Sequence, residues 1–369
     1  MKTEKNLRVA IIGGGIAGAS FATALLNIGI TADLYEQAPE LGEVGAGIGL
    51  RPPTIAFFKK WGIYDLLEKV TTHSDYQELV DGTTSITYHK ERWPAMSDNQ
   101  NERYTRFVHR ADLLDVLIKK IPKEHLHLNH VCTKVLDHGD YAEVHFENGI
   151  VIEADLVIGA DGIRSVVRNQ VLGEVTPVYS GYHAYRTLIS EDDTFGLNKE
   201  ENNLQIVICG SKQIYLLPLK LRRQISVDIT VPHLDSSWRP NVTKETILDS
   251  IKEYDSRMIQ LVNHIPMEKF TCRPLYDIDP LEKWSTGCVT LIGDAAHAML
   301  HNIGQGANAA IQDAGVLTDY LGDLDKKSLP DILKAYEMKR KPLTTIYQNL
   351  SRIFPDRQAE TALTEKEYY

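Results

Sequence analysis

The sequence predicts an α/β protein with a Rossmann-like lobe, a β-rich lobe inserted into it, and C-terminal helices. Three observations predict this fold class. Gly13 to Gly18 form a glycine loop between an apolar strand and a helix. Far downstream, a second apolar strand ends in Gly293-Asp294 and leads into another glycine turn and helix. Between them, residues 179 to about 273 consist mostly of β-type runs separated by polar turns.

The first elements form a βαβ unit. Residues 8–12 are predicted to be a buried strand, residues 19–28 a helix that Gly29 ends, and residues 31–35 a second strand. Five glycines, with Thr, Ser and Asn, interrupt the uncharged run over residues 9–32. The run therefore favours strand, turn and helix over a signal peptide or membrane span, and we expect a cytoplasmic protein.

Periodicity predicts the elements that follow. We expect helices over residues 52–61, 65–70, 110–121, 243–263 and 330–350, hairpins within residues 126–158 that turn at Asn148-Gly149, and a buried strand over residues 155–159. Runs such as Gln205-Ile-Val-Ile-Cys209 and Ile225-Ser-Val-Asp-Ile-Thr-Val231 indicate an antiparallel sheet in the inserted lobe.

The composition limits the functional class. The chain has 369 residues, with 50 acidic and 40 basic side chains and a net charge of −10. This charge argues against nucleic acid or an anionic membrane as the main partner. The four cysteines are scattered without a Cys-x-x-Cys pair, so neither a metal site nor a disulfide framework is indicated.

The glycine loop matches the dinucleotide fingerprint. Gly13 permits a tight turn, Gly15 lets the backbone approach a pyrophosphate, and Gly18 lets the helix pack on the strand. The helix N-terminus supplies free amides and a partial positive charge for phosphates. Glu36, at the end of the second strand, is placed to accept hydrogen bonds from an adenosine ribose.

Two further segments point to one extended cofactor. Asp161-Gly162 and Gly293-Asp294 each follow an apolar strand, where a carboxylate can meet hydroxyls of a ribose or polyol. Gly304-Gln-Gly306 then opens a helix of small residues that can abut a flat ring. The amides and dipole of that helix favour an anionic reduced flavin.

The ordered motifs resemble a known family. They are Gly13 to Gly18, Glu36-Gln37, Gly45-Ala-Gly-Ile48, Arg110 within His109-Arg-Ala-Asp-Leu113, Asp161-Gly162, and Gly293-Asp294-Ala-Ala-His297 followed by Gly304-Gln-Gly306 and Asp313-Ala314. Across roughly residues 7–350 this set is similar to the group A flavin-dependent aromatic hydroxylases, which share the para-hydroxybenzoate hydroxylase fold. Tyr179-Ser-Gly-Tyr-His-Ala-Tyr-Arg186 resembles the salicylate and 6-hydroxynicotinate hydroxylase branch.

The resemblance implies a cofactor and a chemistry. It implies non-covalent FAD in a GR2-type Rossmann-like domain, with NAD(P)H as the reductant and dioxygen forming a hydroperoxyflavin that hydroxylates an activated ring. It assigns Asp294 to the FAD polyol or pyrophosphate region, Glu36 to the ribose, and Arg110 to the pyrophosphate side. Asp161 and Gly162 would serve FAD and the NAD(P)H approach. Further expected cofactor contacts are Gln37, Gly47, Cys132, Gly304, Gly306 and Ala307.

The change to β-type runs over residues 179 to about 273 predicts a domain division in which the second lobe is inserted into the first. The FAD-binding domain would comprise residues 1–72, 100–175 and 275–355, and the substrate-binding sheet domain residues 73–99 and 176–274. Residues 356–369 would be a charged tail.

Three departures from the family pattern mark candidate catalytic residues. His301 replaces the usual flavin-facing proline, where it would deprotonate a phenol or hydroxypyridine, hydrogen-bond a substrate carbonyl, or only pack in the loop. Gly49 stands where the hydroxynicotinate branch has a histidine, so Arg51 either contacts the flavin, binds an acidic substrate, or is a solvated loop residue. Tyr215 either supplies a hydroxyl lost at Leu217 or is a core tyrosine.

These features favour an FAD-dependent, NAD(P)H-using monooxygenase acting on a small aromatic or N-heteroaromatic compound. One alternative is oxygenation of a larger polycyclic or antibiotic substrate. Another is a flavin dehydrogenase or reductase that transfers no oxygen. We expect a monomer or a homodimer.

Overall fold

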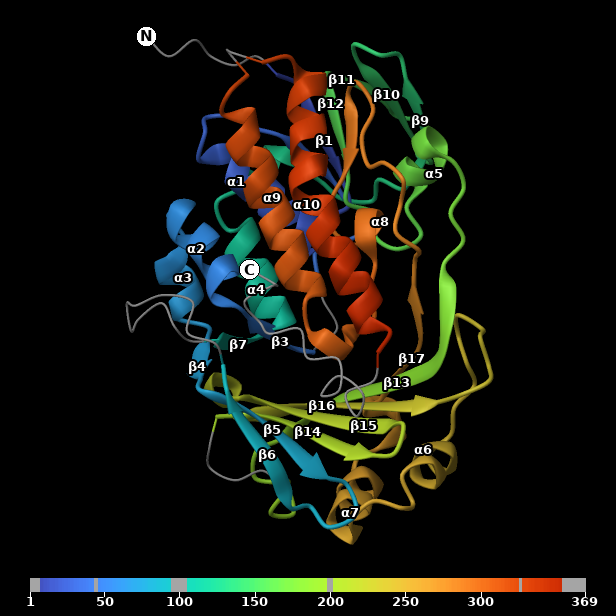
Figure 1. Ribbon diagram of the computed structural model, residues 1–369. Coiled ribbons are helices and arrows are strands. Elements are labelled where there is room, and N and C mark those ends of the chain that lie inside the picture. Colours follow the sequence, from blue (N-terminus) through green and yellow to red (C-terminus); the bar gives the residue numbers. More distant parts are fainter. Residues whose placement is uncertain (1–6, 43–45, 94–104, 198–201, 325–326, 354–369) are drawn as a thin grey trace.

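The computed structural model describes residues 7–42, 46–93, 105–197, 202–324 and 327–353 (Figure 1). The protein has two stacked lobes. The upper lobe contains the helices α1, α9 and α10, and a large sheet forms most of the lower lobe. Gly45 of the Gly-Ala-Gly-Ile motif and the tail at 356–369 lie outside the described residues.

The upper lobe is built on a five-stranded parallel sheet. Its order is β18-β12-β1-β2-β8, and the strands are β1 (Val9–Ile12), β2 (Asp33–Tyr35), β8 (Leu126–His127), β12 (Leu156–Gly159) and β18 (Val289–Leu291). The strands β1, β12 and β18 are buried along their whole length, because helices cover the sheet. The predicted βαβ unit is confirmed.

Three helices form a layer over this sheet. They are α1 (Ile16–Leu26), α9 (Gly306–Leu321) and α10 (Leu329–Ser351), and α9 lies between the other two (Figure 1). The predicted start of α1 at residue 19 is wrong, because the helix begins inside the glycine loop at Ile16, with Gly15 as its N-cap. Gly29 has φ +77°, the left-handed geometry expected of a helix stop.

Smaller elements complete the upper lobe. They are β3 (Gly47–Leu50), β4 (Thr72–Ser74), β7 (Thr105–His109), β9 (Cys132–Asp137), β10 (Ala142–Phe146), β11 (Val151–Ala154), α2 (Pro52–Lys60), α3 (Tyr64–Glu68), α4 (Arg110–Ile118), α5 (Val166–Leu172) and α8 (Asp294–His297), with short 3-10 turns at Lys123–His125 and His301–Ile303. The predicted hairpin at Asn148-Gly149 is confirmed between β10 and β11, and Gly149 has φ +83°.

The lower lobe is a seven-stranded sheet in the order β17-β13-β16-β15-β14-β5-β6. Its strands are β5 (Tyr76–Asp81), β6 (Thr87–Arg92), β13 (Val178–Ser190), β14 (Leu204–Cys209), β15 (Lys212–Leu219), β16 (Gln224–Pro232) and β17 (Thr271–Asp277). Helices α6 (Lys244–Ser250) and α7 (Ser256–His264) cover the face away from the upper lobe (Figure 1). Short 3-10 turns stand at Lys220–Arg222 and Met267–Lys269.

Period-two alternation sorts the large sheet into two faces. Along β16, the apolar Ile225, Val227 and Ile229 belong to the core under α6 and α7. The intervening Ser226 and Asp228 line a cavity on the other face. The sequence pattern of β16 therefore places its polar side chains toward the upper lobe.

The predicted helix over residues 243–263 is wrong as a single element. The chain forms two helices, because Asp255 accepts a hydrogen bond from the Arg257 backbone amide at 2.9 Å and caps a new helix start. In contrast, residues 329–351 form one helix that contains Pro342. Within the described residues, no helix combines the length and apolar character needed to cross a membrane.

The packing of α9 on α2 gives a stability prediction. A Cβ added at Gly315 would lie 2.2 Å from the Phe57 ring, so we expect Gly315→Ala to lower the free energy of unfolding by about 1–3 kcal/mol. Denaturant unfolding would measure the change. The matched control is Phe57→Leu combined with Gly315→Ala, in which the smaller side chain should recover part of the loss. An unchanged midpoint in Gly315→Ala would contradict this packing.

Candidate active site

One cavity of about 1520 Å³ runs between the two lobes. Its lining begins at the glycine loop around Gly15, passes the α9 start at Gly306, and reaches the large sheet at Tyr215 and Asp228. Pockets for small ligands usually hold roughly 300–1000 Å³, so this cavity has room for a large cofactor together with a second molecule. The cavity joins the predicted cofactor residues to the predicted catalytic ones.

The glycine loop has the geometry of a phosphate cradle. Gly13 has φ +109°, and a Cβ there would lie 2.3 Å from the Ala160 carbonyl oxygen. A Cβ on Gly18 would lie 2.0 Å from the Gly13 carbonyl oxygen, so this glycine is required for the turn to close. Gly15 differs from both, because no protein atom beyond its chain neighbours lies within 4 Å of its Cβ position, and the residue lines the cavity.

Glu36 hydrogen-bonds to the glycine loop, and Arg110 lies elsewhere along the cavity. The Glu36 carboxylate accepts hydrogen bonds from the backbone amides of Gly14 at 2.7 Å and Ala38 at 2.9 Å, which fixes it at the end of β2. Its remaining lone pairs can still accept from a ribose. Arg110 begins α4 and lines the cavity, whereas Gln37 is exposed and does not.

Asp161 and Cys132 stand outside the cavity lining, as do Gly13, Gly18, Glu36 and Gln37. The Asp161 carboxylate accepts from Ser165 Oγ at 2.5 Å and from the backbone amides of Val166 and Val167, so it caps α5. Burial raises the pKa of Asp161. Cys132 lies at the start of β9, where burial raises the pKa of its thiol to about 12. Only Gly162 of the Asp-Gly pair lines the cavity.

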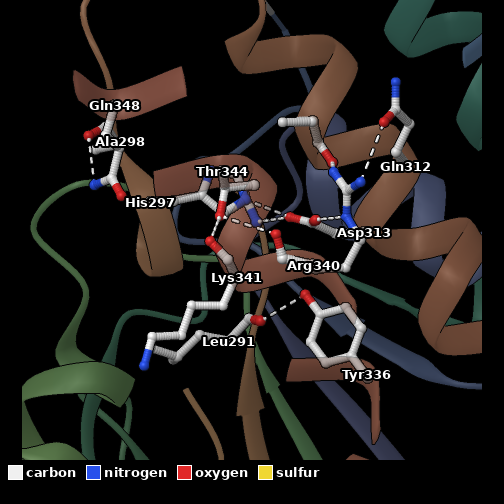
Figure 2. Close-up of polar contacts among 12 residues, drawn as sticks. Leu291, His297, Ala298, Gln312, Asp313, Tyr336, Arg340, Lys341, Thr344 and Gln348 are labelled. Atoms are coloured by element: carbon white, nitrogen blue, oxygen red, sulfur yellow. Dashed lines mark hydrogen bonds and ion pairs between the residues drawn. The ribbon is translucent and has the colours of Figure 1, made fainter. Parts of the chain in front are cut away.

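A buried charge cluster of Asp313, His297 and Arg340, whose side chains Figure 2 shows, holds the Gly293-Asp294 turn. One Asp313 carboxylate oxygen accepts from the Gly293 amide at 3.0 Å and contacts His297 Nε2 at 2.5 Å, and the other accepts from Arg340 Nε at 2.7 Å. Burial alone would raise the pKa of Asp313, but His297 and Arg340 outweigh it and lower the pKa. Asp294 itself is exposed to the cavity.

Asn308 connects three segments beside the start of α9. This residue was not identified from the sequence. Its side-chain amide donates to the carbonyls of Gly49 at 2.9 Å and Gly304 at 3.1 Å, and its oxygen accepts from the Arg51 amide at 2.9 Å. Gly304, which has φ +63°, lines the cavity beside the first residues of α9, including Gly306 and Ala307. The sequence places this asparagine two residues after Gly306, and the structure shows that it is buried.

Gly47 lies where the two lobes touch. Its amide donates to Ser226 Oγ at 2.9 Å, and a Cβ at this position would lie 2.4 Å from a Leu217 methyl group. The strand β3 therefore approaches the large sheet as closely as glycine allows.

A polar row crosses the cavity face of the large sheet. Arg186 on β13, Asp228 on β16 and Tyr215 on β15 are direct cross-strand neighbours. Arg186 Nε donates to Asp228 Oδ2 at 2.5 Å. Burial raises the pKa of Asp228, but the adjacent Arg186 cation opposes this effect and the pKa is lowered, so the carboxylate stays ionised. Side chains alternate along β13, so Tyr185, the neighbour of Arg186, faces the opposite core.

His301 meets this row from the upper lobe. Its Nε2 lies 2.9 Å from Thr230 Oγ1 and 3.6 Å from Asp228 Oδ1, and its ring packs edge-on against Tyr215 at 5.6 Å between centroids. The Tyr215 hydroxyl donates to Gln213 Oε1 at 2.5 Å, so only its ring faces His301. Burial lowers the pKa of His301 to about 4, against the opposing effect of Asp228.

The hydrogen bonds assign the His301 tautomer. The Thr230 hydroxyl has one proton, and the ionised Asp228 can only accept, so the hydroxyl donates to the carboxylate at 3.0 Å. The contact between Thr230 and Nε2 must then be donated by the imidazole. A neutral His301 protonated on Nε2 leaves Nδ1 as an acceptor, and Nδ1 has no hydrogen-bond partner among the described residues.

Arg51 lies on the same cavity at the start of α2. Its guanidinium carbon is 3.9 Å from the Trp93 ring centre, and Nη1 donates to Thr105 Oγ1 at 3.3 Å. The indole and the hydroxyl hold the cation against the cavity wall.

A family model described as "FAD binding domain" matches residues 6–349. The chain belongs to this family. The expected FAD cofactor and the resemblance to group A flavin-dependent aromatic hydroxylases are thereby confirmed.

Relatives and solved structures agree with this membership. The 6-hydroxynicotinate 3-monooxygenase of Bordetella bronchiseptica is 30% identical over 358 residues, covering 93% of this chain and 90% of the relative. A salicylate hydroxylase of Pseudomonas putida is 30% identical over 370 residues, covering 91% and 82%. Klebsiella pneumoniae HpxO, complexed with FAD and uric acid, superposes with a TM-score of 0.85 at 22% identity, covering 99% of this chain and 91% of that chain.

The cavity of this FAD-binding protein fits the cofactor. The helices α1 and α9 both open onto it, and neither N-terminus has a side-chain cap. Their first amides are therefore available to phosphate and flavin oxygens. The open Cβ position of Gly15 and the exposed Asp294 carboxylate supply the close approach and the acceptor that the extended cofactor needs.

Substitutions at Gly15 and Gly18 should have different effects, one on cofactor binding and the other on folding stability. Gly15→Ala adds a methyl group only toward the cavity, so we expect the apoprotein stability to hold while the FAD dissociation constant rises at least about tenfold. Gly18→Ala, in contrast, should lower the free energy of unfolding by about 1–3 kcal/mol, because its Cβ overlaps the Gly13 carbonyl. Flavin fluorescence titration and denaturant unfolding measure the two effects, and the same response in both variants would refute the distinction.

Proposed function

We propose that the enzyme hydroxylates a small aromatic or N-heteroaromatic acid that already carries a ring hydroxyl, using FAD, NAD(P)H and dioxygen. The observation that carries this proposal is that His301 lines the cavity while its buried Nδ1 has no hydrogen-bond partner among the described residues. The substrates named for the relatives, 6-hydroxynicotinate, 3-amino-4-hydroxybenzoate and salicylate, share a ring, a hydroxyl and a carboxylate, which supports this class.

The chain would hold FAD through the glycine loop, Glu36, Arg110, Asp294 and the α9 start. When bound, FAD supplies the redox chemistry, taking electrons from NAD(P)H and activating dioxygen for transfer of one oxygen atom. The protein's part is to position the ring, exclude water and accept a proton.

His301 is the proposed proton acceptor. A base whose pKa is about 4 is too weak to ionise a resting phenol, whose pKa is roughly 10. As oxygen adds to the ring, however, positive charge develops there and the ring hydroxyl becomes strongly acidic. Nδ1 then accepts the hydroxyl proton, while Thr230 and Asp228 stabilise the resulting imidazolium from the Nε2 side.

Arg51 is the proposed contact for the substrate carboxylate. Its cation lines the same cavity as His301 and is held in place by Trp93 and Thr105. A guanidinium can bind a carboxylate through two parallel hydrogen bonds, which would orient the ring as well as hold it. Tyr215 would contribute its ring, because its hydroxyl is engaged by Gln213.

We also propose the domain division at residues 1–72, 100–175 and 275–355 against 73–99 and 176–274. The seven-stranded sheet, drawn from residues 76–92 and 178–277, supports it. A cytoplasmic location is proposed because all four cysteines are free thiols. The oligomeric state is proposed as monomer or homodimer.

The decisive test is a screen of hydroxylated aromatic acids and hydroxypyridines for stimulation of NAD(P)H oxidation by the holoenzyme. A true substrate should accelerate oxidation and yield a product carrying one atom from ¹⁸O₂. Accelerated oxidation with no label in the product would instead support a dehydrogenase. If no compound accelerates oxidation, the proposed substrate class is wrong.

His301 variants test the proton acceptor. His301→Asn keeps an acceptor near the Nδ1 position but removes the base, so hydroxylation should slow about 100-fold or more while substrate still binds. The acid limb of the wild-type profile for kcat/KM should lie near pH 4, because the pKa of His301 is lowered there and neutral imidazole persists above it. His138→Asn, at an exposed site, is the control. Unchanged coupling of NAD(P)H oxidation to product would make His301 structural.

Arg51→Gln tests recognition of the carboxylate. Loss of a charge-assisted contact should raise KM about 10- to 100-fold for a carboxylated substrate, with a smaller effect on its decarboxylated analogue. Arg106→Gln is the matched control, since Arg106 contacts Tyr64 and Glu68 and does not line the cavity. Equal effects on both substrates would show that Arg51 does not bind the carboxylate.

A further inference from the structure

The cavity floor continues past Tyr215 toward the β6 edge of the large sheet. Tyr215 pairs with Ile206 on β14, and Ile206 pairs with Leu79 on β5. All three residues line the same cavity. Neighbouring strands lie about 4.8 Å apart, so Leu79 stands roughly 10 Å from Tyr215 across the sheet. We call the part of the cavity over Ile206 and Leu79 the apolar arm.

Alternation along the strands places both residues of the apolar arm on the cavity face. Their chain neighbours Val80 and Val207 belong instead to the hydrophobic core under α6 and α7. Among the described residues, neither Ile206 nor Leu79 belongs to a hydrophobic core cluster. Their apolar surface is therefore available to a molecule in the cavity.

A second pair of apolar residues borders the apolar arm. Leu204 lies two residues before Ile206 on β14, and Leu217 lies two residues after Tyr215 on β15. A separation of two residues puts side chains on the same face of a strand, and both leucines line the cavity. The floor is therefore apolar over two neighbouring rows of the sheet.

This second pair also connects the apolar arm to Arg51. Leu204 and Leu217 pack in one cluster with Trp93 and Phe107. The Trp93 ring centre lies 3.9 Å from the Arg51 guanidinium carbon. A carboxylate bound by Arg51 would therefore lie beside this apolar cluster, with the rest of the molecule free to extend over the arm.

The apolar arm ends at polar side chains near β6. Gln77 Nε2 donates to Glu91 Oε2 at 3.0 Å, and His89, the cross-strand neighbour of Leu79, lies 3.8 Å from Glu91. The side chains of His89 and Glu91 are 55% and 48% exposed, so this end meets solvent. A polar ligand group placed on Ile206 or Leu79 would lose hydration without gaining a hydrogen bond from them, so the arm favours an apolar group.

We propose that the substrate is a hydroxylated aromatic acid with an apolar substituent that lies on Ile206 and Leu79. This inference rests on the proposed function, which places the ring hydroxyl at His301 and the carboxylate at Arg51. It goes beyond the substrates named for the relatives, because 6-hydroxynicotinate and salicylate are single rings without such a substituent. The two strand spacings between Tyr215 and Leu79 set the length of the substituent at roughly 10 Å.

A series of 2-hydroxybenzoates with alkyl chains of increasing length at ring carbon 4 or 5 tests the proposal on the holoenzyme. The change in flavin absorbance measures binding, and without NAD(P)H no turnover occurs. Each methylene that reaches the apolar arm should lower the dissociation constant about two- to fourfold, until the chain exceeds roughly 10 Å. A dissociation constant that stays constant or rises with chain length in both series would overturn the proposal.

Substitutions in the apolar arm should reduce the dependence on chain length. Leu79→Gln places an amide on the floor and Ile206→Trp fills it, so each should reduce the gain per methylene to less than about 1.5-fold. Thermal melting checks that each variant is folded, and Leu79→Gln keeps the test usable if the larger ring does not fit. An undiminished gain in folded variants would show that the chain does not lie on these residues.

Ile86→Gln is the matched control for these variants. Ile86 lies between β5 and β6, is 64% exposed and does not line the cavity, so this variant should keep the wild-type dependence on chain length. If Ile86→Gln lost the dependence as well, the effect of the arm variants would not be specific to the arm and the assignment would be wrong.

Two outcomes separate this inference from the proposed function. If 2-hydroxybenzoate binds and is hydroxylated but longer chains bring no gain, the apolar arm is not a substrate site and the proposed function stands. If no member of the series binds to the wild-type holoenzyme, the proposed substrate class and this inference are both wrong.

Discussion

The buried Asp313 carboxylate is the interaction on which the cofactor side of the cavity depends. It binds the Gly293 amide, His297 and Arg340, and so joins the turn after β18 to α9 and α10 (Figure 2). A buried carboxylate with two cationic partners and an amide is stable, whereas removal of one partner of such a cluster costs about 3–5 kcal/mol. The cluster fixes where Asp294 and the start of α9 stand.

Polar contacts also couple the cofactor side of the cavity to the large sheet. Thr230 on β16 meets His301 on the turn before α9, and Gly47 on β3 meets Ser226 on the same strand. The two lobes therefore touch through polar groups that the cavity also uses. A shift of one lobe relative to the other would change both the space above the large sheet and the orientation of His301. Domain packing would therefore affect the proposed proton transfer to His301.

Local patterns predicted most of the fold, and the site only in part. The glycine loop, the Asn148-Gly149 hairpin and the β-rich insertion depend on near neighbours, so sequence revealed them. The break at Asp255 was missed because a side-chain cap competes with helical periodicity over only a few residues. Asp228 was missed although β16 alternates polar and apolar residues. Its pairing with Arg186 and His301 joins segments that only the sheet register brings together.

The proton step depends on a neutral His301 that is protonated on Nε2 and can accept through Nδ1. Nitrogen-15 NMR of selectively labelled histidine in the holoenzyme measures this directly, with His301→Asn assigning the signal. The spectrum should show one protonated Nε2 and one unprotonated Nδ1 from about pH 5 to pH 8, because the pKa of His301 lies near 4. A proton on Nδ1, or an imidazolium at pH 7, would contradict it.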